Sequence, residues 1–219
     1  MTGPTIVVVR NEIDEAYEYH CDALSERIPC ATEIDFPGGG RLEIGSIDGV
    51  ILTGSTAGAY EIADRAWIEE QSDLIRTLVA ERIPTLGVCF GHQIANQALG
   101  GTVTSVGTTS QLIELELRDD PLFEEMHPVV PAVHGDKVTQ VGDGMEIIAS
   151  ASYYEAFATR HREAPLWTVQ NHPEFTESLK DRIEADFGWT ETSYTFDAVN
   201  AEVIFDNFRR LVKKHAIAT

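Results

Sequence analysis

A chain of 219 residues, of which 43% are hydrophobic, is long enough to bury a substantial core, and we expect one domain over residues 1–219. Its 36 acidic and 16 basic residues give a net charge of −20, which argues against nucleic acid or an anionic membrane as a partner. The acidic residues are spread along the whole chain and lysines are few, a pattern that suggests a halophilic protein adapted to high intracellular salt.

The cysteines argue against disulfides and thiolate metal sites. Cys21, Cys30 and Cys89 form no C-x-x-C pair, so neither a disulfide framework nor a bound metal is expected. No basic segment followed by a long apolar stretch opens the sequence, and no later run is long enough to span a membrane. We therefore expect a cytoplasmic protein that needs no metal and no cofactor.

The first part of the chain alternates short apolar runs with helical patterns. The order strand, helix, strand, strand, helix is predicted over residues 5–10, 11–27, 29–34, 48–53 and 67–82. Such an order predicts a parallel sheet with right-handed crossovers. The third strand runs into a loop of small residues whose backbone N–H groups could face a ligand, although a plain connector would look the same.

A cysteine then stands between an apolar run and the next helical pattern. Cys89 has Gly87 two positions before it and Gly91 two positions after it, which is the G-x-S-x-G nucleophile elbow with a thiol in place of the hydroxyl. So sharp a turn strains its central residue and requires small neighbours, and the start of the following helix favours a thiolate. The pattern indicates a nucleophile, while a buried structural cysteine is the alternative.

Beyond this elbow the apolar runs follow one another closely, which predicts antiparallel hairpins that extend or flank the sheet. They fall at residues 102–106, 112–117, 129–133, 137–141, 146–151, 156–159 and 166–169. Helical patterns at residues 177–187 and 198–214 make residues 176–219 a helical C-terminal segment. The whole order predicts an α/β fold, with an open, mostly parallel twisted sheet, helices on both faces and added hairpins.

A thiolate that attacks an amide needs an imidazole as base and acid, usually held by a carboxylate. His172 follows the predicted strand at residues 166–169, at the sheet edge where open α/β folds form their sites. Glu174 is two positions further on and can hold the imidazole. His20 lies outside any such constellation and is expected to be solvated, and His92 is expected to be structural.

Four motifs in this order resemble the class I, or triad, glutamine amidotransferase domain, and in particular the amidotransferase part of GMP synthetases. They are G-S at residues 54–55, G-V-C-F-G-H-Q at 87–93, H-G-D-K-V at 134–138 and V-Q-N-H-P-E at 169–174. The resemblance reaches from the first strand to about Phe175 and implies the flavodoxin-like fold of that family.

The resemblance also implies a role for each matching residue. Cys89 would be the nucleophile, His172 the general base and then acid, and Glu174 the residue that orients the imidazole. The oxyanion hole would use backbone groups of Gly54, Ser55 and Phe90. The glutamine substrate would be held by Gln93, His134, Gly135 and Asp136.

Four departures from the family's patterns place the chain on a divergent, GMP-synthetase-like branch. The family's G-G-P loop is G-S-T at residues 54–56, Ala132-Val133 stands where a serine usually precedes H-G-D, and Asn171 replaces the phenylalanine of F-H-P-E. The family's basic-E-x-G element is also missing between Gly101 and Glu116. Because G-G-P is replaced, the sequence does not predict the geometry of the oxyanion loop.

The implied reaction hydrolyses glutamine through a cysteine thioester to glutamate and ammonia. The sequence after the triad has no room for a synthetase domain, so we expect a separate ATP-dependent synthetase chain to take the ammonia. The resemblance suggests GMP synthetase, and hence purine biosynthesis. Two alternatives stay open: a stand-alone cysteine hydrolase of γ-glutamyl amides or peptides, and a non-catalytic regulatory homologue.

Overall fold

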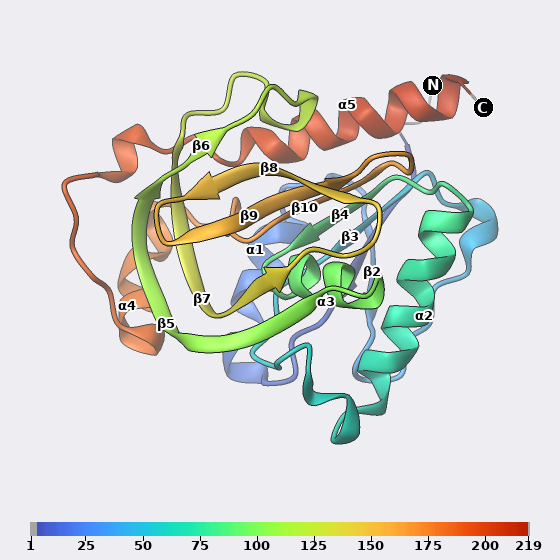
Figure 1. The fold of residues 1–219 in the computed structure, drawn as a ribbon, viewed down its shortest axis with the longest axis horizontal. Coiled ribbons are helices and arrows are strands. Elements are labelled where there is room, and N and C mark those ends of the chain that lie inside the picture. The colour runs from blue at the N-terminus through green and yellow to red at the C-terminus, as the bar shows by residue number, and fades with distance from the viewer. Residues whose placement is uncertain (1–3, 219) are drawn as a thin grey trace.

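The computed structural model describes residues 4–218, which contain a mixed eight-stranded sheet and a separate two-stranded sheet. In spatial order the large sheet consists of β2 (Thr32–Asp35), β1 (Ile6–Arg10), β3 (Gly49–Leu52), β4 (Thr85–Val88), β10 (Leu166–Val169), β9 (Tyr154–His161), β8 (Met145–Ala151) and β6 (Glu116–Leu117). The first five of these pair in parallel, and β9, β8 and β6 continue the sheet in antiparallel pairing (Figure 1). This confirms the predicted parallel sheet with an antiparallel extension.

Helices pack on both faces of the large sheet. They are α1 (Tyr19–Ser25), α2 (Ala66–Ala80), α3 (Phe90–Ala98) and α5 (Val203–Ala218). Helix α4 (Lys180–Phe187) packs instead beside the two-stranded sheet, where its Ile183 is buried with Val133 and Phe175. Gly49 and Leu52 are three positions apart in β3, so they face opposite sides of the sheet. A Cβ atom at Gly49 would lie 2.8 Å from Val212 of α5, whereas a Cβ atom at Gly91 of α3 would lie 2.9 Å from the Cβ of Leu52. Therefore α3 and α5 cover opposite faces, as predicted.

The C-terminal helix shares the core of the sheet. Ile204, Phe205 and Phe208 of α5 are fully or almost fully buried in the same hydrophobic cluster as Val8 of β1 and Ile51 of β3. Residues 4–218 include no helix that is both long enough and apolar enough to cross a membrane.

The two-stranded sheet differs from the prediction in its length. Strands β5 (Thr102–Glu114) and β7 (Val129–Gln140) pair antiparallel as one long curved ribbon (Figure 1), where the sequence suggested two short strands in each region. The register shifts between Ser105 and Thr109, and Gly107 within this stretch has a φ of +90°. Such a bulge bends a strand without ending it, which explains why the apolar pattern appeared broken there.

The helix predicted over residues 11–27 was wrong at its start. A 3₁₀ turn covers Glu15–Tyr17 and α1 begins only at Tyr19. Asn11 makes contacts elsewhere: its backbone N–H donates to the Thr53 hydroxyl at 2.9 Å, and its side-chain amide donates to the Thr53 carbonyl at 3.1 Å. These contacts to the end of β3 hold the chain out of a helix, because tertiary contacts outweigh local preference.

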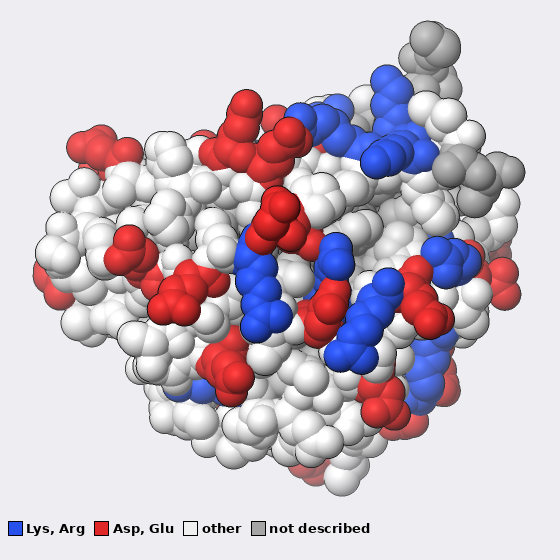
Figure 2. Space-filling model, turned by 45° about the horizontal axis from the view of Figure 1, so that its top comes forward, with Lys and Arg blue, Asp and Glu red and all other residues white. Residues whose placement is uncertain are grey.

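The surface carries acidic side chains over many elements. Figure 2 shows them interspersed with basic ones over the visible face rather than collected in a single patch. Arg10 lies within salt-bridge distance of three acidic side chains, those of Glu18, Asp22 and Glu33. The 36 acidic residues outnumber the 16 basic ones and give a net charge of −20, so self-repulsion of the surface depends on screening by salt.

Candidate active site

The turn between β4 and α3 has the predicted elbow geometry. Cys89 occupies it with φ 52° and ψ −104°, a combination that L-residues rarely adopt. A Cβ atom at Gly87 would lie 2.5 Å from the Gly91 carbonyl oxygen, and one at Gly91 would lie 2.5 Å from the Leu52 carbonyl oxygen. Both glycines are therefore required by close backbone approach, and the turn cannot relax without losing its packing.

The side chain of Cys89 lies at the N-terminal end of α3 and is 7% exposed. Its Sγ is 3.5 Å from Nε2 of Gln170, which donates to it, and 3.7 Å from the Val133 carbonyl oxygen. The partial positive charge of a helix N-terminus stabilises a thiolate over a thiol. Gln170 had no role in the sequence-based prediction, yet it contacts the thiol directly.

An imidazole–carboxylate pair follows the end of β10. Nδ1 of His172 and Oε1 of Glu174 are 2.6 Å apart, and the two residues are 5% and 1% exposed. The His172 ring also stacks on Phe175 with centroids 4.3 Å apart. Burial alone would lower the pKa of His172, but charge interactions and hydrogen bonds with Cys89 and Glu174 raise it well above its usual value.

Gly54, just after β3, lies where these side chains meet. A Cβ atom at this position would be 3.1 Å from Cε1 of His172 and 3.6 Å from Cβ of Cys89. The structure thus brings Cys89, His172 and Glu174 together from the ends of two neighbouring parallel strands, β4 and β10. This is the sheet edge at which sites of open α/β folds form.

A cavity of about 300 Å³ opens beside the thiol, a size typical of small-molecule sites. Of the residues predicted to act in the site, its lining includes Ser55, Cys89, Gln93, His134, Gly135, Asp136 and His172. The other three lie just outside it. Glu174 is next to His172, Gly54 borders both His172 and Cys89, and the ring of Phe90 packs against Trp67 with centroids 5.5 Å apart. Only the backbone of Phe90 is therefore suited to the predicted role.

Residues that line the cavity form a hydrogen-bonded cluster. Nε2 of Gln93 is 3.4 Å from the Asp136 carbonyl oxygen, and the His134 ring lies 3.1 Å from that oxygen and 2.9 Å from the Tyr153 hydroxyl. Burial lowers the pKa of His134 to about 4, so its imidazole is neutral near pH 7. Burial also raises the pKa of Asp136, whose carboxylate accepts a hydrogen bond from Tyr60 at 3.3 Å.

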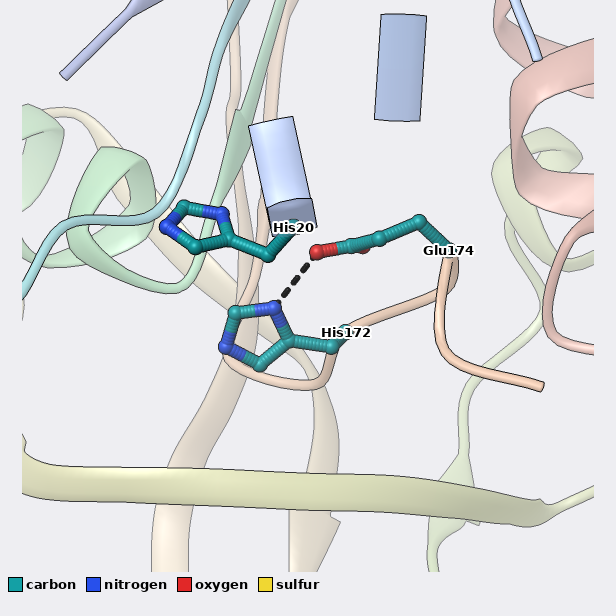
Figure 3. A group of neighbouring side chains, drawn as sticks. All are labelled: His20, His172 and Glu174. Atoms are coloured by element: carbon teal, nitrogen blue, oxygen red, sulfur yellow. Dashed lines mark hydrogen bonds and ion pairs between the residues drawn. The ribbon is translucent and has the colours of Figure 1, made fainter. Parts of the chain in front are cut away.

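The prediction that His20 is solvated was wrong. Its ring is 6% exposed, its centroid is 5.9 Å from that of His172, and its Nε2 is 2.9 Å from Oε2 of Glu12. Figure 3 shows the His20 ring beside the His172–Glu174 pair. The late start of α1 turns His20 inward, and no local spacing in the sequence marks it. By contrast, His92 is fully buried and contacts the Thr168 and Tyr154 hydroxyls, as a structural residue should.

His20, His172 and Glu174 also form the group within residues 4–218 that could hold a metal, since their ligand atoms lie within 4.8 Å of one another. Their contacts are those of imidazole–carboxylate pairs, because Nδ1 of His172 bonds Glu174 and Nε2 of His20 bonds Glu12. A metal would have to bind the second ring nitrogen of each histidine or displace these hydrogen bonds. The arrangement suits proton transfer and nucleophilic attack better than metal binding.

Comparison with known proteins adds to this geometry. The family model described as glutamine amidotransferase class-I matches residues 9–189. One of the subunits of the glutamine-hydrolyzing GMP synthase of Methanothermobacter thermautotrophicus is 33% identical over 156 residues, which cover 68% of this chain and 75% of that protein. The glutamine-hydrolyzing GMP synthase of Mycobacterium marinum is 39% identical over 95 residues, 42% of this chain but only 18% of that longer protein.

Among solved structures, a glutamine amidotransferase from Thermotoga maritima superimposes with a TM-score of 0.72 at 20% identity, covering 97% of this chain and 98% of that one. At this identity the likeness concerns the fold. It confirms the predicted flavodoxin-like architecture with its added antiparallel strands.

Proposed function

Because the chain belongs to the class-I glutamine amidotransferase family, we propose that it hydrolyses glutamine with Cys89 as nucleophile, His172 as base and acid, and Glu174 as the residue that orients His172. The observation that carries this proposal is the strained Cys89 elbow beside a buried imidazole–carboxylate pair, with Gly54 bordering both. A nucleophile, a base and a group that orients the base are the three parts that an acyl transfer needs.

The raised pKa of His172 favours an imidazolium beside a Cys89 thiolate before substrate binds. The thiolate attacks the carboxamide carbon of glutamine, and an oxyanion develops on the carbonyl oxygen. As the carbon–nitrogen bond breaks, His172 gives its proton to the departing ammonia and a γ-glutamyl thioester remains on Cys89. His172 then takes a proton from water, and the resulting hydroxide attacks the thioester. The carbon–sulfur bond breaks, glutamate leaves and its new γ-carboxylic acid loses its proton, which restores the Cys89 thiolate beside the His172 imidazolium.

Backbone N–H groups of Phe90 and of Gly54 or Ser55 bind the oxyanion in this proposal. Phe90 begins α3 directly after the nucleophile, so its N–H belongs to the first turn, where helical N–H groups have no intrahelical acceptor, and Gly54 borders both Cys89 and His172. Removing one such donor typically lowers kcat about 10²- to 10³-fold.

The part of glutamine beyond the carboxamide is held by other residues of the cavity lining. Gln93, His134, Gly135 and Asp136 line the cavity together with Glu61. A wall with two carboxyl groups and a neutral imidazole suits the α-ammonium group of the substrate better than a second anion. These residues support binding, while the chemistry stays with Cys89 and His172.

We propose that the ammonia passes to a separate ATP-dependent synthetase chain, and that the separate chain is a GMP synthetase of purine biosynthesis. The similarity to a protein described as one of the subunits of a GMP synthase supports the proposal. The chain matches only 18% of the length of the Mycobacterium marinum GMP synthase.

Glutamate release from glutamine tests the proposal. Cys89→Ala should reduce it to background while the protein stays folded, and Cys30→Ser, which changes an exposed cysteine, should leave it unchanged. Equal glutamate release by Cys89→Ala and the wild type would refute the mechanism. A GMP synthetase partner supplied with ATP and XMP should raise the rate, whereas high unassisted turnover of γ-glutamyl peptides would favour a stand-alone hydrolase.

A further inference from the structure

Glu12 has a buried carboxylate that connects two distant segments of the chain. Its Oε1 accepts hydrogen bonds from the Ile13 and Asp14 N–H groups at 2.8 and 3.1 Å and from the Thr56 hydroxyl at 2.5 Å. Its Oε2 accepts from the Thr56 N–H at 3.0 Å and from His20 at 2.9 Å. Burial would raise the pKa of Glu12, but hydrogen bonds from His20 and Thr56 lower it overall, so the carboxylate is ionised.

The preceding residue holds the other end of the same loop. Asn11 donates its backbone and side-chain N–H groups to the hydroxyl and carbonyl of Thr53. The Thr53 hydroxyl donates in turn to the Gly54 carbonyl oxygen at 2.9 Å. Asn11 and Glu12 therefore fix residues 53 and 56, the two ends of the loop that contains Gly54 and Ser55. The Thr56 N–H is bonded to Glu12. The N–H groups of Gly54 and Ser55 therefore remain to face the cavity.

His20 also contacts the loop at Gly54, and it lines the same cavity as Cys89 and His172. Its Cε1 would be 3.3 Å from a Cβ atom at Gly54. Burial lowers its pKa, but hydrogen bonds with Cys21 and Glu12 raise it to about 9, against a smaller opposing effect of His172. Near pH 7 the pair is thus an imidazolium on a carboxylate. Figure 3 shows that the His20 ring also lies close to Glu174.

We propose that Glu12 and His20 are positioning residues that fix the oxyanion-binding loop beside Cys89. Glu12 acts through Thr56, and His20 holds Glu12 in place and packs against Gly54. The proposal rests on the proposed function, because it concerns the alignment of the same oxyanion hole. It gives a structural reason why a G-S-T loop can serve at residues 54–56: the threonine offers an N–H and a hydroxyl, and Glu12 binds both.

The test separates oxyanion stabilisation from thiol reactivity. Glutamine hydrolysis develops an oxyanion, whereas alkylation of Cys89 by iodoacetamide displaces iodide and develops none. Glu12→Gln should lower kcat for glutamine about 10- to 100-fold with little change in KM, because small misplacement of a donor costs this much. The alkylation rate of the Cys89 peptide, followed by mass spectrometry, should stay within about twofold. Glu15→Gln is the matched control, since that carboxylate is exposed on the same segment.

Thr56→Val removes only the hydroxyl bonded to Glu12 and should lower kcat by at least about threefold. Because Glu12 acts through Thr56, the double variant should be no slower than Glu12→Gln alone. Unchanged kcat in Glu12→Gln, or fully additive losses, would overturn the proposal. If Glu12→Gln also loses alkylation through misfolding, Thr56→Val decides: a kcat loss with normal alkylation supports positioning, and normal kcat overturns it. A wild-type protein that releases no glutamate would instead refute the proposed function.

Discussion

Replacing Cys89 by glycine should give a more stable protein than replacing it by alanine, which reverses the usual order of these two residues. Both substitutions remove the sulfur and both should abolish glutamine hydrolysis. They differ in one methyl group, and that group determines whether residue 89 can occupy φ 52°, ψ −104° without strain.

The size of the effect follows from two opposing contributions. A residue with a Cβ atom held in so sparsely populated a region costs of the order of 1–3 kcal/mol. Glycine avoids that cost but loses about 0.5–1 kcal/mol through its greater freedom in the unfolded chain. The free energy of unfolding should therefore be about 1 kcal/mol higher for Cys89→Gly than for Cys89→Ala, or about 2–4 °C in Tm for a chain of this size.

Urea titration of the two variants measures this difference, and Cys21 provides the control. Cys21 is fully buried in α1 and is not among the positive-φ residues of the described chain. There the order should be the ordinary one, with Cys21→Ala about 1 kcal/mol more stable than Cys21→Gly. If the Cys89 pair shows the same order as the Cys21 pair, the elbow stores no strain and this reasoning fails.

Two further predictions concern pH and salt. Burial lowers the pKa of His92 to about 3, whereas in the unfolded chain this imidazole is protonated below about pH 6.5. The stability that the neutral imidazole contributes is therefore present above about pH 6.5 and is lost as the pH falls toward 3. His92→Gln should reduce the loss of unfolding free energy between about pH 6.5 and 4.5 by about 2 kcal/mol in urea titrations, and an unchanged loss would contradict a neutral His92. Because a net charge of −20 is spread over the surface, raising KCl from about 0.1 M to about 2 M should raise Tm; an unchanged Tm would rule out adaptation to salt.

The nucleophile elbow could be predicted because its sequence pattern is local. Gly87 and Gly91 each stand two positions from Cys89. Gly87 is required by a contact within the turn, whereas Gly91 is required by the close approach of Leu52 in β3. The His172–Glu174 pair is equally local, since two positions along the chain place Nδ1 and Oε1 2.6 Å apart. The order of strands and helices then brings both groups to one sheet edge.

The contacts of Asn11 and Glu12 that hold the loop at residues 53–56 could not be predicted, because they join residues far apart in the chain. Glu12 and Thr56 are separated by 44 positions, and neither has a spacing that marks the pair. The expected helix over residues 11–27 placed His20 on a solvated surface, whereas the Asn11–Thr53 contacts delay α1 and turn His20 inward. The length of β5 and β7 was missed for a similar reason, since a bulge hides their continuity.

Trapping the acyl-enzyme tests the central claim most directly. Protein mixed with glutamine and quenched in acid within a turnover should carry a γ-glutamyl group on the peptide that contains Cys89, and hydroxylamine should remove it, as expected of a thioester. The same peptide should stay unmodified in His172→Ala, where no imidazole serves the thiol. Glutamate formed at the normal rate with no adduct on Cys89, or with the adduct on another residue, would contradict a thioester mechanism at this site.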